Sequence, residues 1–147
     1  MEHNPTIYYP ITIGHSFYPM VNPIMDLNNS IYVEQSRIIK EMADESDCVI
    51  VGRCADYVLR EQNPFRLFVY ADMESKMKRC RAKGPEDEKL TDRELKQKIQ
   101  GIDKKRAKYY EFYTGNKWGD KLNFDLCINT TQTQIKEIVP AIAKLLG

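Results

Sequence analysis

The stretch Cys48-Val49-Ile50-Val51-Gly52 is a short, continuous apolar run that ends at a glycine. A run in which apolar and polar residues do not alternate is typical of a strand that is buried on both faces, as in a parallel sheet. Two similar runs follow along the chain, at 66–71 (RLFVYA) and 124–129 (FDLCIN). We therefore predict three strands of one parallel sheet.

Helical patterns alternate with these runs. Apolar residues at helical spacing predict a helix over about 29–44, with Asn29 or Ser30 at its N-cap. Capping residues indicate three later helix starts: Asp72 before a helix to about Lys83, Thr91-x-x-Glu94 before a long helix to Tyr113, and Thr131-x-x-Gln134 before a last helix that contains Pro140. This order predicts an α/β fold in which helices flank a parallel sheet in three layers.

The first 29 residues carry four prolines, which oppose a long helix. We expect an irregular lead-in over 1–29, with a short strand around Tyr8–Ile13, followed by one α/β domain over 30–147.

The composition excludes several classes of protein. The chain has 147 residues and a net charge of +1, which argues against electrostatic binding of nucleic acid. Its four cysteines are widely separated, which favours neither a zinc site nor a disulfide scaffold and indicates a reduced interior. No secretory pattern and no apolar run of about 18 residues is present, so we expect a cytoplasmic protein without a membrane partner.

Arginines mark the candidate site. Arg53 directly follows the first predicted strand, where ligands of open α/β sheets bind, and its guanidinium suits a phosphate or a carboxylate. The alternative is a structural pair with Asp47 or Asp56. Arg106 lies on the apolar face of the long helix, one turn after Asp103, and a guanidinium that faces inward requires an anion.

Other features allow simpler explanations. Arg79 and Arg81 lie at the end of a helix, where the helix dipole favours cations. The aromatic residues that follow Arg106 could stack on bases, although packing against the sheet is favoured. They are Tyr109, Tyr110, Phe112, Tyr113 and Trp118.

Two blocks of sequence resemble the cytidylate-kinase-like family of nucleoside monophosphate kinases. The first is VIVGRCADYVL with the following RLFVYA and the helix that carries Arg79. The second, more specific block is IDKKRAKYYEFYTGNKWGD with FDLCINTT. The resemblance covers about residues 30–147 and implies a P-loop kinase fold. It also implies transfer of the ATP γ-phosphoryl group to a CMP-like nucleoside monophosphate, with Mg²⁺.

The resemblance also implies roles for individual residues. Arg53 matches the Gly-Arg pair that binds the acceptor phosphate, and Arg79 matches an arginine at the base of a lid over about 79–113. Asp103 and Arg106 match the Asp-x-x-Arg of the returning lid helix. On this basis three arginines would converge on one polyphosphate and stabilise the charge of the transition state.

The chain departs from the family pattern at two places. Cys54 stands where cytidylate kinases have an aspartate that reads the nucleoside; Asp56 is a nearby candidate for that contact, and specificity for cytosine is in doubt. The sequence also contains no G-x-x-x-x-G-K-[ST], and Ile11–Gly14 lacks the glycines that follow such a strand.

Two hypotheses follow from these departures. In the first, the chain is a kinase homologue that lacks the first strand, the P-loop and its helix, through truncation or a shortened gene, and has lost kinase activity. In the second, it is a non-catalytic interaction or nucleotide-binding module, and its open sheet edge pairs with a second protomer. A weaker third idea is RNA binding by the basic helix.

Overall fold

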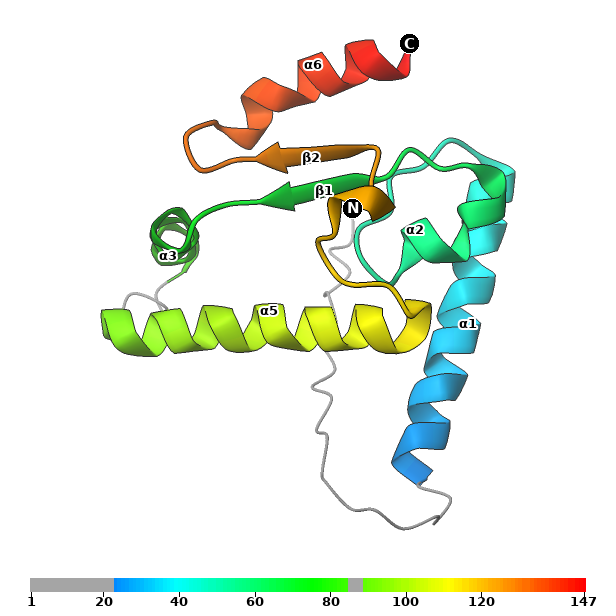
Figure 1. The fold of residues 1–147 in the computed structure, drawn as a ribbon, viewed down its shortest axis with the longest axis horizontal. Helices are drawn as coiled ribbons and strands as arrows, with labels where there is room; N and C mark the ends of the chain where they lie inside the picture. The colour runs from blue at the N-terminus through cyan, green and yellow to red at the C-terminus, as the bar shows by residue number, and fades with distance from the viewer. Residues whose placement is uncertain (1–22, 85–88) are drawn as a thin grey trace.

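The computed structural model describes residues 23–84 and 89–147. Figure 1 shows the elements in these ranges. In chain order they are α1 (Pro23–Glu45), α2 (Ala55–Val58), the 3-10 turn η1 (Arg60–Gln62), β1 (Leu67–Tyr70), α3 (Met73–Lys83), α5 (Asp92–Thr114), the 3-10 turn η2 (Lys121–Asn123), β2 (Leu126–Asn129) and α6 (Ile135–Leu146).

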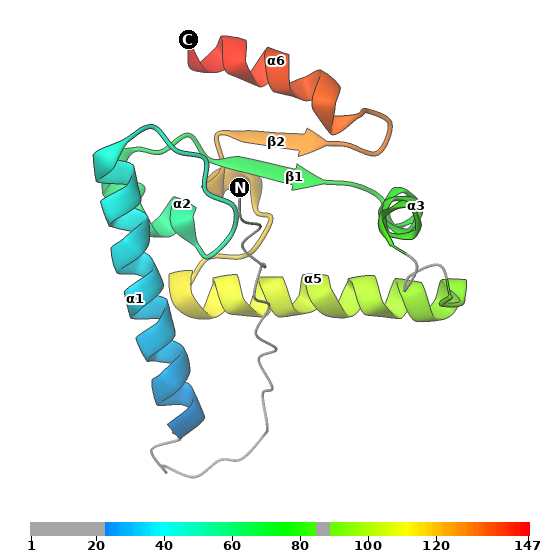
Figure 2. The same cartoon turned by 180° about the vertical axis from the view of Figure 1, so that it is seen from behind.

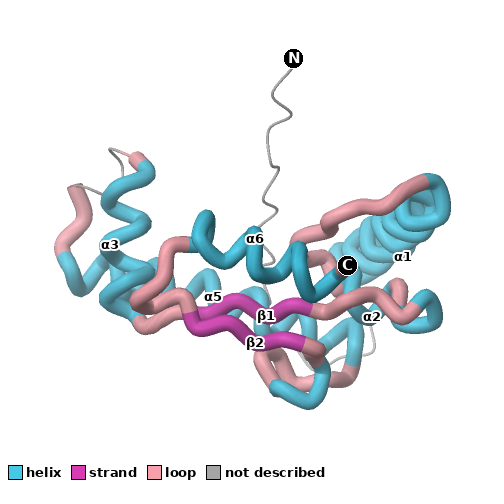
Figure 3. The backbone as a smooth tube through the Cα atoms, turned by 90° about the horizontal axis from the view of Figure 1, so that it is seen from above, coloured by secondary structure: helices cyan, strands magenta, loops and turns pink. Residues whose placement is uncertain are grey.

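The described sheet consists of β1 and β2. They pair in parallel, with Leu67 opposite Leu126 and Tyr70 opposite Asn129. This confirms two of the three predicted strands and the α/β class. α6 lies on one side of the sheet and α5 on the other (Figures 1 and 2). Both strands point toward α3 (Figure 1), and α1 and α2 lie beyond their opposite ends (Figure 3).

The prediction of a buried strand at Cys48–Gly52 is wrong. Residues 47–51 belong to no helix or strand, and the side chains of Val49 and Val51 are 95% and 89% exposed. A strand needs a neighbour to satisfy its backbone amides and to cover its side chains. No described strand pairs with this segment.

The first helix begins earlier than expected. The chain is already helical at Pro23, so α1 begins before residue 29. Proline is well tolerated in the first turn of a helix, because the amide that it lacks has no partner there. The strand predicted around Tyr8–Ile13 lies outside the described residues.

Two of the three predicted caps are confirmed. The Asp72 carboxylate accepts a hydrogen bond from the Ser75 amide at 2.8 Å, and Thr91 and Glu94 form the predicted capping box of α5. The third prediction is wrong. α6 begins after Gln134, which makes no side-chain cap, and the Thr131 hydroxyl instead accepts from the Asp72 amide at 2.9 Å.

The apolar core is divided between two places. Ile39 of α1 packs against Ala55, Val58 and Leu59 around α2. On α5, Leu95 and Ile99 are buried, with Leu95 fully inaccessible. α6, in contrast, leaves several large apolar side chains exposed, namely Ile135, Val139, Leu145 and Leu146.

Candidate functional site

A buried threonine joins the carboxyl ends of both strands to α3. Thr130 is only 1% exposed, and its hydroxyl donates to the Tyr70 carbonyl at 3.0 Å. The same oxygen accepts from Nη1 of Arg79 at 2.9 Å, and Nη2 of Arg79 donates to the Thr130 carbonyl. We call this arrangement the Arg79–Thr130 clamp. It holds the guanidinium of Arg79 against the end of β2.

One carboxylate joins α3 to α5. Oδ2 of Asp103 accepts from Nζ of Lys76 at 2.6 Å, and Oδ1 accepts from Nη1 of Arg106 at 3.2 Å. Asp103 is largely buried, with 21% of its side chain exposed. We call Lys76, Asp103 and Arg106 the Asp103 cluster. Two cations share one carboxylate, so the cluster carries a net positive charge.

The Asp103 cluster borders a cavity of about 420 Å³ that also reaches Phe68, Tyr70 and Trp118. Arg106 was expected to face inward with the apolar residues of its helix, and this expectation is wrong, because its side chain is 57% exposed. Leu95 and Ile99 on the same helix are buried, but Ile102 is exposed. The buried face of α5 is therefore interrupted around Ile102 and Arg106, where the helix borders the cavity, and it resumes at Tyr110 and Thr114.

Arg53 lies in a strained turn between the exposed segment and α2. Gly52, Arg53 and Cys54 have φ angles of 75°, 57° and 55°, three successive residues in the left-handed region. That region is unfavourable for residues with a Cβ atom, and such strain often occurs at functional sites. The Arg53 side chain is hydrogen bonded to Tyr109, which lies one turn after Arg106 on α5.

The residues around Arg53 form a poorly hydrated cluster. Burial raises the pKa of Tyr109 to about 12 and that of Cys54 to about 12, so the Cys54 thiol stays protonated at neutral pH. Asp56 accepts a hydrogen bond from the Tyr110 hydroxyl at 2.7 Å. Burial and this bond raise the pKa of Tyr110. The hydroxyl occupies Oδ2 of Asp56, and a carboxylate can accept further hydrogen bonds.

The predicted site residues do not all meet at one cavity. Of that set, Asp103 and Arg106 line the 420 Å³ cavity, whereas Arg79 is held by Thr130 and Arg53 lies beside Tyr109. Sequence reasoning missed Lys76, which completes the Asp103 cluster from another helix. The only signal in the sequence is its place one turn before Arg79 on α3.

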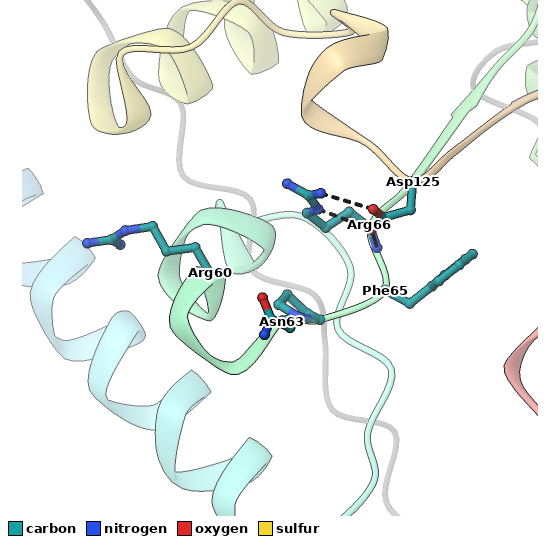
Figure 4. A pocket seen from close by; sticks show the side chains of 6 residues that line it. Arg60, Asn63, Phe65, Arg66 and Asp125 are labelled. Carbon is teal, nitrogen blue, oxygen red and sulfur yellow. Dashed lines mark hydrogen bonds and ion pairs between the residues drawn. The ribbon is translucent and has the colours of Figure 1, made fainter.

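A second cavity, of about 310 Å³, lies near the amino ends of the strands (Figure 4). Arg66 there makes a two-pronged ion pair with Asp125, at 3.1 and 2.9 Å, and its amide also donates to that carboxylate. These bonds lower the pKa of Asp125 to about 2. Arg60 points away from the pair. Because Asp125 already neutralises Arg66, this cavity is the weaker candidate for an anion.

Residues 23–84 and 89–147 contain no group of three or more His, Cys, Asp or Glu side chains placed to hold a metal. Mg²⁺ on a nucleotide needs only one or two carboxylates. Asp103 is the carboxylate of the cavity, but Lys76 and Arg106 already occupy it. These residues fit phosphate groups, and they do not fit Mg²⁺.

No helix in the described part of the chain is both long enough and apolar enough to cross a lipid bilayer.

Comparison with known proteins identifies the family. One solved structure, an uncharacterized protein from Eubacterium ventriosum ATCC 27560, is 29% identical, with a TM-score of 0.69 over 88% of this chain and 68% of that one. No curated protein matches. The model of the cytidylate kinase-like family matches residues 5–132, so the relationship extends into the lead-in, beyond the 30–147 expected. The chain belongs to the cytidylate kinase-like family.

Proposed function

We propose that this chain binds the phosphate groups of a nucleotide, with Arg53 and Arg106 as phosphate ligands and Asp103 as the residue that orients Arg106. The observation that carries the proposal is the Asp103 cluster, in which Lys76 and Arg106 border a cavity and share one carboxylate. The excess of positive charge favours an anion. Arg106 is well exposed, so a ligand can reach it.

We further propose that these 147 residues bind the nucleotide without transferring its phosphoryl group. Transfer of the ATP γ-phosphoryl group needs backbone amides and a lysine that cradle the triphosphate. The printed sequence has no G-x-x-x-x-G-K-[ST] to supply them.

Within this proposal Arg79 is a positioning residue. The Arg79–Thr130 clamp supports that role, because both ends of its guanidinium donate to Thr130. Asp56 is the proposed contact for the nucleoside of a CMP-like ligand, beside the Tyr110 hydroxyl that it already binds.

Calorimetric titration with CMP, ATP and pyrophosphate tests the binding. Arg53→Gln and Arg106→Gln should each weaken binding about tenfold or more, the range for a hydrogen bond to a charged group. Arg93→Gln is the matched control, because Arg93 is an exposed arginine in the first turn of α5. Loss of stability in both variants at unchanged affinity would mean that Arg53 and Arg106 are structural residues.

A kinase assay tests the second part of the proposal. The purified chain, given ATP, Mg²⁺ and CMP, should form no CDP above a protein-free control. Formation of CDP at a rate that Arg106→Gln abolishes would overturn the non-catalytic assignment.

A second candidate function is self-association through the sheet. β1 pairs with β2 on one edge, and no described strand pairs with its other edge. Such an edge presents unpaired backbone groups to another chain. We propose that the partner is a second copy of this chain. Light scattering after size exclusion should then give a dimer whose fraction rises with concentration, and a monomer at all concentrations would contradict the idea.

A further inference from the structure

Aromatic side chains line the 420 Å³ cavity together with the Asp103 cluster. Phe68 and Tyr70 are two residues apart on β1, so their side chains lie on the same face of the sheet. Their ring centroids are 6.2 Å apart, and the Trp118 ring meets Phe68 edge-on at 5.3 Å. The lining of the cavity therefore combines ring surfaces with cationic side chains.

A glycine holds the tryptophan in this place. Gly119 has a φ angle of 77°, and a Cβ atom added there would lie 3.0 Å from Cζ of Phe68. The backbone after Trp118 thus passes directly over the Phe68 ring, an approach that a larger residue would block. This close approach brings Trp118 beside β1, where its ring meets Phe68 edge-on.

Lys121 adds a further cation to the lining. It is exposed and begins η2, two residues after Gly119. Its ammonium group forms no ion pair with any residue of the described ranges. The lining therefore contains one carboxylate, that of Asp103, and three cationic side chains, those of Lys76, Arg106 and Lys121.

We propose that this cavity binds the base of a nucleoside monophosphate against Tyr70 and Trp118, with the phosphate at Lys76 and Arg106. The inference rests on the proposed function and refines it: the base lies against Tyr70 and Trp118 instead of at Asp56, and Lys76 joins Arg106 at the phosphate. The cavity volume lies within the range of about 300–1,000 Å³ found for small-molecule sites. An uncharged apolar occupant would remove water from three cations without compensating them, whereas an aromatic anion compensates them and covers the rings.

Trp118 makes the proposal directly measurable, because it is the only tryptophan in the sequence. Excited at 295 nm, the unaltered chain should lose emission in a saturable way as CMP or cytidine is added, with CMP effective at lower concentration. Pyrophosphate should displace CMP and restore the emission, and pyrophosphate alone should leave the emission unchanged.

The same ligands distinguish this inference from the proposed function. If neither CMP nor pyrophosphate gives a calorimetric signal, the proposed function fails and this inference fails with it. If CMP binds by calorimetry while Trp118 emission stays constant, nucleotide binding stands and the cavity is not the site of the base.

Two variants test whether CMP contacts the aromatic residues of the cavity or changes the Trp118 emission from a distance. Tyr70→Leu should weaken CMP binding about tenfold, as expected when one stacking partner is lost, and should leave pyrophosphate affinity unchanged. Phe112→Leu is the matched control, because Phe112 is an exposed aromatic residue of α5 outside the cavity lining. Equal CMP affinities of wild type and Tyr70→Leu would overturn the proposal, and the measurement on the unaltered chain holds even if Tyr70→Leu does not fold.

Discussion

Replacing Thr130 with valine removes the hydroxyl of the Arg79–Thr130 clamp and keeps the branched shape of the buried side chain. Two hydrogen bonds disappear, one donated to the Tyr70 carbonyl and one accepted from Arg79. A hydrogen bond to a charged group contributes about 1.5–3 kcal/mol and a neutral one about 0.5–1.5 kcal/mol.

Two remaining bonds reduce the expected loss. The Thr130 amide still donates to the Tyr70 carbonyl at 2.8 Å, and Arg79 still donates to the Thr130 carbonyl. Neither partner is left without a hydrogen bond, so we expect a destabilisation near the lower end of the sum, about 2 kcal/mol. With a typical urea m-value of about 2 kcal/mol/M, the unfolding midpoint should fall by about 1 M.

Urea unfolding followed by circular dichroism measures this midpoint. Thr133→Val is the control, because the Thr133 side chain is half-buried and its hydroxyl makes no hydrogen bond with a described residue. If Arg79 positions the phosphate site, pyrophosphate affinity of folded Thr130→Val should fall together with the unfolding midpoint, whereas affinity within a few fold of the wild type would make the clamp purely structural. An unchanged midpoint in Thr130→Val would refute the clamp as a source of stability.

Two other perturbations give equally direct outcomes. Gly119→Ala should destabilise the fold by about 1–2 kcal/mol or more, because Gly119 has a positive φ and lies against the Phe68 ring. Gly101→Ala is the control: Gly101 lies inside α5 with open space around it, so the change should stabilise the fold by about 0.5–1 kcal/mol. Equal urea midpoints for the two variants would contradict this expectation. The pKa of Asp125 is lowered to about 2 in the folded chain. Its contribution to the free energy of unfolding is therefore present above the unfolded-state pKa of about 3.9 and is lost as the pH falls from about 4 to 2. Asp125→Asn should therefore flatten the acid limb of a plot of urea midpoint against pH, and an identical limb in the variant would exclude the Arg66–Asp125 pair as its cause.

The features that the sequence predicts well depend on neighbouring residues. Asp72 and Thr91 are caps because the amides that they bind lie three residues away. β1 and β2 were predicted from continuous apolar runs, and both have a partner strand. The run at Cys48–Gly52 has the same pattern and no described partner, so it forms no strand.

The failed predictions depend on residues far away in the chain. Thr131 has the local pattern of a capping box, but the Asp72 amide, which no local pattern indicates, takes its hydroxyl. Helical periodicity correctly places Arg106 and Leu95 on the same face of α5. It does not show which residues of other elements pack against that face at each turn. Lys76 reaches Asp103 from another helix, and such pairs are visible only after α3 and α5 are packed together.

The parallel pairing of β1 with β2 has a consequence for the order of folding. The contact between Arg66 and Asp125 spans 59 positions, and both α3 and α5 lie inside the loop that it closes. Closing a long loop costs entropy before any strand contact is made, whereas the capping box of α5 forms from adjacent residues. We therefore expect α5 to form early and the sheet late, with the closing of this loop setting the refolding rate.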